Sequence, residues 1–234
     1  MKDLHSHICY GIDDGCKTVE QSAFLLKKMA AAGFTDIFLT PHYIEDTNSV
    51  APNKVKRQII NNLKDICEEE GIPLNLYEGN EVYLTDNVVE YIENDEIMTL
   101  NGTKYILMEF SMHLDNPNIR TILHNVMSCG YIPVIAHPER YTYMTLDRLQ
   151  DLQDMGVLFQ GNYLSLFDKY GKLPRKNLEK YLKAGLITFL GSDIHHDEEL
   201  HMDKVYKKLK KYVKSDQKVY DLMEGNVDKI LLNK

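Results

Sequence analysis

The sequence predicts a mixed α/β fold in which parallel strands alternate with helices and close into a TIM-like barrel. Short apolar runs alternate with helical patterns from one end of the chain to the other, which is typical of repeated strand–helix units. The length of 234 residues suits one barrel domain, and 44% hydrophobic and 26% charged residues are ordinary globular values. No linker or internal repeat divides the chain, so we expect a single domain over residues 1–234.

The first strand is expected at about residues 2–7, followed by a helix with Thr18 as its N-cap and Gly33 as its stop. The inward residues of this helix are expected to be Val19, Ala23, Leu26 and Ala30. The second strand is predicted at 36–40, and the helix after it ends at Gly71. This helix has the clearest periodicity in the chain, at Val55, Ile59, Ile60, Leu63, Ile66 and Cys67.

The remaining strands are predicted at residues 75–81, 105–110, 132–136, 157–160 and 187–191. A Lys-rich segment at 204–214 has the spacing of an amphipathic helix with its lysines in solvent.

Net charge and the N-terminus exclude several classes of protein. The formal charge of −8 argues against binding to nucleic acid or to an anionic membrane. The first seven residues are polar, and no apolar run approaches the roughly 20 residues that span a bilayer. We therefore expect a cytoplasmic protein without membrane insertion; the sequence gives no expectation about its oligomeric state.

The four cysteines, Cys9, Cys16, Cys67 and Cys129, form no Cys-x-x-Cys pair. This spacing fits reduced, mostly buried thiols better than a disulfide framework or a zinc knuckle. None is followed six positions later by Arg, which disfavours a phosphatase with a cysteine nucleophile.

Histidines and acidic residues recur at or directly after the predicted strand ends. These residues are His5, His7, His42, Glu81, Glu109, His137, Asp193 and His195. Because all strand ends of a parallel barrel point to one face, these side chains are expected to converge there. A lone His-x-His pair is weak evidence for a metal, but the Asp193-Ile194-His195 pair repeats its geometry. The alternative is a set of satisfied core histidines and surface acids.

Glu109 lies inside the apolar run YILMEFSM, where an unpaired carboxylate would be costly to bury, so a metal ion is the expected partner. Imidazole and carboxylate ligands without thiolate favour manganese, iron or zinc. We expect two or three divalent ions. Four carboxylates, with Asp14 as the fourth, would leave three such ions with a positive pocket suited to a phosphate monoester. Arg140 can clamp that phosphate; its alternative role is a surface pair with Glu139.

Six segments together resemble one family: DLHSHICYGIDDG, TPHY, GNEVYL, ILMEFS, VIAHPERY and GSDIHH. They are similar, in order and from Met1 to beyond residue 200, to the PHP (polymerase and histidinol phosphatase) family. The most similar branch comprises bacterial protein-tyrosine phosphatases of capsule and exopolysaccharide synthesis. The resemblance implies a distorted (β/α)7 barrel with a trinuclear, commonly manganese-dependent site. It also implies hydrolysis of phosphotyrosine by metal-activated water, with a tyrosine autokinase as the substrate protein.

The resemblance also implies three ligand sets, in which Glu81 is a bridge. The first ion would be held by His5, His7, Glu81 and Asp193, the second by Glu81, Glu109 and His137, and the third by Asp14, His42 and His195. Arg140 would be the catalytic, phosphate-binding arginine.

One feature departs from the family pattern: relatives often carry a further Arg after the Asp-x-His motif, where this chain has the acidic HHDEELHM. His196 or His201 would have to substitute, or both are solvated loop histidines. Two other functions remain open, namely a small-molecule phosphatase such as histidinol phosphatase and a non-catalytic metal-binding scaffold. A nuclease is disfavoured by the acidic charge.

Overall fold

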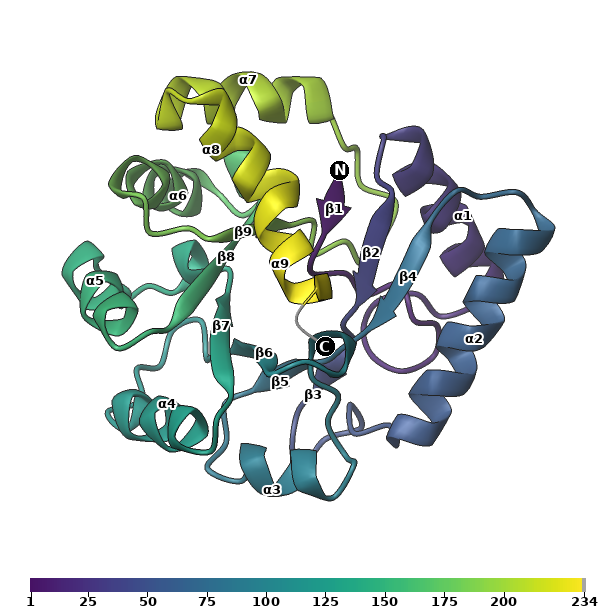
Figure 1. Cartoon of the computed structure of the whole chain (residues 1–234), viewed down its shortest axis with the longest axis horizontal. Coiled ribbons are helices and arrows are strands. Elements are labelled where there is room, and N and C mark those ends of the chain that lie inside the picture. The colour runs from purple at the N-terminus through teal and green to yellow at the C-terminus, as the bar shows by residue number, and fades with distance from the viewer. Residues whose placement is uncertain (233–234) are drawn as a thin grey trace.

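A computed structural model describes residues 1–232 and shows parallel strands inside a ring of helices (Figure 1). The strands are β1 Lys2–Asp3, β2 Asp36–Leu39, β3 His42–Tyr43, β4 Asn75–Glu78, β5 Glu81–Tyr83, β6 Tyr105–Glu109, β7 Ile132–Ala136, β8 Leu158–Asn162 and β9 Phe189–Gly191. The helices are α1 Val19–Ala31, α2 Asn53–Glu69, α3 Val88–Glu93, α4 Ile119–Ser128, α5 Leu146–Asp154, α6 Lys172–Ala184, α7 Met202–Val213, α8 Asp216–Tyr220 and α9 Asn226–Leu232. None of the helices within residues 1–232 has both the length and the apolar character needed to cross a bilayer.

The strands form two parallel sheets that are successive parts of one ring. Their orders are β1-β2-β4 and β3-β5-β6-β7-β8-β9. Since β3 follows closely after β2 and β5 after β4, each pair counts as one barrel strand with a break in it, here called a stave. The ring closes where Ser6 bridges Ile194, and where the Asp193 amide donates to the His5 carbonyl at 2.8 Å. The predicted α/β barrel is confirmed, and residues 1–232 supply the seven staves expected of a distorted (β/α)7 barrel.

Three strand predictions need correction. The strand expected at 75–81 is two strands, so Glu81 begins β5 instead of ending β4. The break falls at Gly79, where an added Cβ would lie 2.9 Å from Leu100 Cδ2. The first strand is shorter than residues 2–7, and His42 lies in β3, which was not predicted. Strands of two or three residues are too short to show an apolar alternation in the sequence.

The helix predictions hold better, with shifts in the inward faces. Thr18 caps α1 as expected, by accepting a hydrogen bond from the Gln21 amide. The buried face of α1 is Ser22, Leu25, Leu26 and Met29, so of the four expected residues Leu26 is fully buried. In α2, Val55 is 41% exposed while Lys56 is buried, with Nζ donating to Asn80 Oδ1 at 2.7 Å. The Lys-rich segment forms α7 with its apolar side inward, as predicted.

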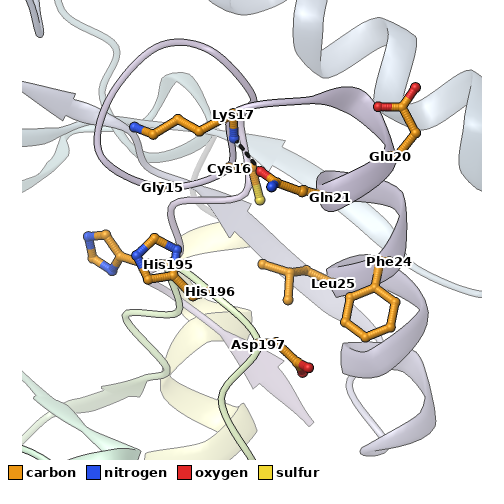
Figure 2. Close-up of a pocket in the computed structure, with 10 residues that line it drawn as sticks. All are labelled: Gly15, Cys16, Lys17, Glu20, Gln21, Phe24, Leu25, His195, His196 and Asp197. Atoms are coloured by element: carbon orange, nitrogen blue, oxygen red, sulfur yellow. Dashed lines mark hydrogen bonds between the residues drawn. The ribbon is translucent and has the colours of Figure 1, made fainter.

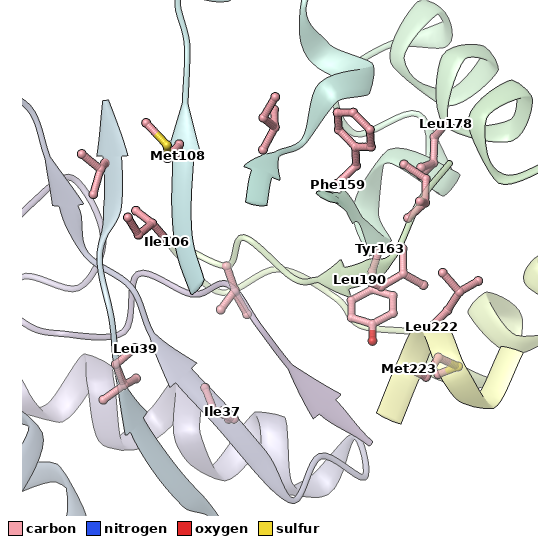
Figure 3. Packing of buried hydrophobic residues seen from close by; sticks show 14 of the residues in the cluster. Ile37, Leu39, Ile106, Met108, Phe159, Tyr163, Leu178, Leu190, Leu222 and Met223 are labelled. Atoms are coloured by element: carbon pink, nitrogen blue, oxygen red, sulfur yellow. The ribbon is translucent and has the colours of Figure 1, made fainter. Parts of the chain in front are cut away.

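The strands alternate between two hydrophobic clusters, one inside the barrel and one under the helices. The outer cluster includes Phe159 and Leu190, which gather with Leu178 where α6 covers the strands (Figure 3). The inner cluster contains Leu4, Phe38, Leu107, Val134 and Phe189, together with Val227 and Ile230 of α9. The Asn226 side chain donates to the Thr188 carbonyl at the start of β9, so α9 closes the end where the strands begin. The opposite face, at the strand ends, is left for the polar residues.

Candidate metal centre

The first group of predicted ligands is fully buried and converges on a single point. His5 and His7 follow β1 and flank Ser6, which bridges Ile194 just after β9. Glu81 begins β5, and Asp193 follows β9. Glu81 Oε2 lies 3.2 Å from both His5 Nε2 and His7 Nε2. Asp193 Oδ1 lies 3.5 and 3.4 Å from the same two nitrogens. The arrangement places two imidazoles and two carboxylates within reach of one cation.

A second group shares Glu81 with the first. His42 Nδ1 lies 3.0 Å from Glu81 Oε2 and 2.9 Å from Glu109 Oε1. His137 Nε2 contacts the other oxygen of the same carboxylate, Glu81 Oε1, at 2.8 Å. Of the expected set, Glu81 and Glu109 converge with His42, which was expected in another set. His137 lies outside this cluster and contacts the other oxygen of Glu81. Glu81 lies between the two groups, as a bridging carboxylate must.

The third group lies at the rim. His195 Nε2 and His42 Nε2 lie 3.3 and 3.6 Å from Asp14 Oδ1, and the His7 and His195 rings stack at 3.9 Å between centroids. The Asp14 side chain is 71% exposed, unlike the buried carboxylates of the other two groups. The expected set of Asp14, His42 and His195 is thus assembled at the solvent side, with His7 beside it.

Several of these atoms have no satisfactory partner without a cation. Glu81 Oε2 and His42 Nδ1 are buried and lie 3.0 Å apart, but neither atom has a partner in hydrogen-bond geometry among residues 1–232. His5 Nε2 and His7 Nε2 face each other at 3.0 Å. A neutral imidazole carries a proton on one nitrogen and a lone pair on the other. Since both Nδ1 atoms face acceptors, the two facing Nε2 atoms are the ones left with lone pairs. Burial lowers the pKa of His7, but the neighbouring carboxylates outweigh it and raise this pKa to about 10. Orphaned donors and acceptors around one carboxylate fit a site for divalent cations.

Two of the expected ligands have left-handed backbones. His137, before Pro138, has φ 34°, and Asp193 has φ 52°. Such values are uncommon outside glycine and are concentrated at functional sites. Gly191 is required nearby, because a Cβ there would lie 2.7 Å from His5 Cβ. The local backbone is therefore held in a strained form that aims Asp193 at the histidines.

The ligands are oriented by a layer of residues that sequence reasoning missed. Gln160 Oε1 accepts from His5 Nδ1 and Asp13 Oδ2 from His7 Nδ1, both at 2.8 Å, so each Nε2 points inward. Asp13 also accepts from the His42 amide at 2.9 Å. Acceptors of this kind fix the tautomer of a metal-binding imidazole. The DDG motif marked this loop, but the local pattern does not separate its two aspartates, and the family resemblance implied Asp14 alone.

Arg140 lies in the short 3-10 helix Pro138–Arg140 and points at the metal centre. Its Nη1 donates to Asp193 Oδ2 at 2.9 Å, and its guanidinium lies 4.3 Å from the Tyr170 ring centroid. The alternative pairing with Glu139 is wrong, because Glu139 is buried and accepts from the Asn162 amide and the Ser165 hydroxyl. Burial of that carboxyl outweighs those contacts and raises its pKa.

The other expectations about polar side chains and thiols can also be compared with the structure. His196 and His201 are exposed, as expected of solvated loop histidines. All four cysteines are free thiols, three buried and one exposed, which agrees with the prediction of reduced and mostly buried thiols.

Comparisons with known proteins identify the family. Residues 1–232 match the profile of the CpsB/CapC family, capsular polysaccharide synthesis. The putative tyrosine-protein phosphatase CapC of Staphylococcus aureus is 36% identical over 83% of this chain and 77% of its own. The tyrosine-protein phosphatase CpsB of Streptococcus pneumoniae is 32% identical over 100% of this chain and 99% of its own. The chain has the fold and polar site of a PHP-type barrel. It belongs to the CpsB/CapC family.

The solved structures give the same answer. One match, at TM-score 0.88 and 28% identity, covers 100% of this chain and 95% of the other. It comes from work on YwqE of Bacillus subtilis and CpsB of Streptococcus pneumoniae, named there as unique metal-dependent tyrosine phosphatases.

Proposed function

We propose that the chain, acting as one barrel domain over residues 1–234, is a metal-dependent protein-tyrosine phosphatase. The observation that carries this proposal is Glu81 Oε2, a buried oxygen without a hydrogen-bond partner among residues 1–232 that lies within 3.2 Å of three imidazole nitrogens. This oxygen lies at the face of the barrel where the strands end. The chain belongs to a family whose named relatives are tyrosine-protein phosphatases. We assign the metal ligands as His5, His7, Asp14, His42, Glu81, Glu109, His137, Asp193 and His195.

The residues of this chain divide the work of the reaction. Divalent ions bound here, which we propose to be manganese, would act as Lewis acids on the phosphate ester and the attacking water. Gln160 and Asp13 hold His5 and His7 with Nε2 inward, and Glu81 keeps the two inner groups together. Arg140 is positioned by Asp193 and Tyr170. A guanidinium has five N–H donors, so it can hold Asp193 and bind phosphate oxygens at once.

The proposed physiological substrate is a phosphotyrosine protein, specifically a bacterial tyrosine kinase that regulates polysaccharide synthesis. The named relatives and the capsular polysaccharide family support this choice. A cytoplasmic location stays a prediction from the sequence.

The test compares three substrates with protein stripped of metal and reloaded with manganese. Phosphotyrosine peptide should be hydrolysed by the reloaded protein and not by the stripped protein. Histidinol phosphate is the comparison for a small-molecule phosphatase, and p-nitrophenyl phosphate reports any phosphomonoesterase activity. Preference for histidinol phosphate would refute the proposed substrate, and inactivity on all three would indicate a non-catalytic scaffold.

A further inference from the structure

A pocket of about 390 Å³ adjoins the metal centre, between α1 and the loop that follows β9 (Figure 2). His195 lines this pocket and also faces Asp14 at 3.3 Å in the outer ligand group. The pocket and the metal centre therefore share a side chain. Its volume is within the range of about 300–1,000 Å³ that is usual for small-molecule sites.

Most of the surface that the pocket exposes is apolar, although Lys17, Glu20 and Asp197 also border it. Phe24 and Leu25 project from α1, and Figure 2 shows His195 and His196 across the pocket from them. Phe24 is 52% exposed, although an aromatic ring of this size gains from burial. A half-exposed phenyl ring at the wall of a pocket offers a surface on which another apolar group can pack.

The walls of the pocket are held by contacts on both sides. An ion pair between Lys28 and Asp197 ties α1 to the loop after β9. Gly15 lies so close to His7 that an added Cβ would be 2.0 Å from its carbonyl oxygen. The first contact joins the two walls of the pocket, and the second places the Gly15 wall directly against His7, so the pocket lies beside the candidate metal centre.

We propose that this pocket binds the phenyl ring of the substrate's phosphotyrosine while the phosphate lies at the metal centre. This inference rests on the proposed function. In a tyrosine phosphate the ring is bonded to the ester oxygen, so a phosphate at the ligands places the ring on an adjoining surface. The surface that His195 shares with the centre is apolar and bordered by Phe24, which suits an aryl group packing against it. The pocket selects aryl over alkyl phosphates.

The test measures inhibition constants for phenylphosphonate and inorganic phosphate with manganese-loaded protein. Phe24→Ala should raise the inhibition constant of phenylphosphonate by about 3- to 10-fold, the size of one lost aromatic contact. The inhibition constant of inorganic phosphate should change less than about 2-fold. KM for a phosphotyrosine peptide should rise by a similar factor, and Phe24→Leu should recover part of the loss. Tyr220→Ala is the matched control, because Tyr220 is 48% exposed and lines a different hollow, on α8.

Three results would overturn the assignment. Unchanged inhibition by phenylphosphonate would show that Phe24 contacts no aryl group. Equal weakening of phenylphosphonate and inorganic phosphate would place the effect at the metal centre. A rise in KM for the peptide alone would mean that the pocket holds a residue next to the phosphotyrosine. Wild-type protein that binds phenylphosphonate but hydrolyses no phosphotyrosine would instead refute the proposed function.

Discussion

Replacing Arg140 by Ala should abolish most of the catalysis while the metals remain bound. Arg140 reaches Asp193 Oδ2 at 2.9 Å, but Asn162 Nδ2 and the Tyr170 hydroxyl donate to the same oxygen at 2.8 and 3.3 Å. Two donors therefore still hold Asp193 after the change. Loss of one charge-assisted contact in the transition state is expected to cost about 2–4 kcal/mol in kcat/KM, or roughly 30- to 900-fold.

Arg140→Lys separates charge from shape, because it keeps the cation but loses the planar fork that matches two phosphate oxygens. It should recover part of the lost kcat/KM. Arg148→Ala is the matched control: Arg148 also pairs with an aspartate, Asp115 at 2.7 Å, and also lies over a tyrosine ring, 5.3 Å from the centroid of Tyr143. Steady-state kinetics on a phosphotyrosine peptide should be measured beside metal content. Wild-type kcat/KM in Arg140→Ala, or loss of a metal ion from it, would refute the assignment.

Four further outcomes are expected. Chelation with EDTA should abolish hydrolysis and manganese should restore it, since Lewis-acid chemistry is proposed; full activity without metal would contradict this. His42→Ala and Glu109→Ala should each lower kcat at least about 100-fold in folded protein, whereas the exposed His113→Ala and His124→Ala should be near wild type; equal damage by the controls would be evidence against the site. Replacing all four cysteines by serine should leave some turnover, and a trapped phosphocysteine would overturn the proposed mechanism. Burial lowers the pKa of Lys56 from 10.5 to about 7. Between these two pH values the unfolded chain binds a proton that the folded chain lacks, so the free energy of unfolding rises with pH. The free energy of unfolding, from urea titrations, should therefore rise relative to Lys56→Met by up to about 1.4 kcal/mol per pH unit; parallel pH profiles would refute the effect.

Strand ends could be predicted where a strand has enough residues to display its pattern. Glu109 ends β6, His137 follows β7 and Asp193 follows β9, each after an apolar run visible in the sequence. Glu81 was placed at a strand end because 75–81 looks continuous, but the break at Gly79 depends on packing against Leu100. That contact joins segments that are distant in sequence, so no local pattern encodes it.

The choice between Asp13 and Asp14 illustrates a second limit. Both residues are aspartates in the same turn, and a sequence pattern assigns them equal chemistry. The fold separates them: the Asp13 side chain is buried against His7 Nδ1 and the His42 amide, while that of Asp14 is 71% exposed and faces His195. Which one orients a ligand and which one faces the outer ion position is decided by the path of the loop, and therefore by tertiary contacts alone.

One sequence pattern, QGN at residues 160–162, belongs to the residues that orient the proposed ligands. Gln160 and Asn162 lie two residues apart on β8, so both face the same side, toward His5 and Asp193. Gly161 between them faces outward, where a Cβ would lie 2.6 Å from Leu178 Cδ1. Two amides at alternate positions of a buried strand each require a hydrogen-bond partner inside the barrel. The partners are the imidazole of His5 and the carboxylate of Asp193, so the pattern QGN in a buried strand marks the layer behind the proposed metal ligands.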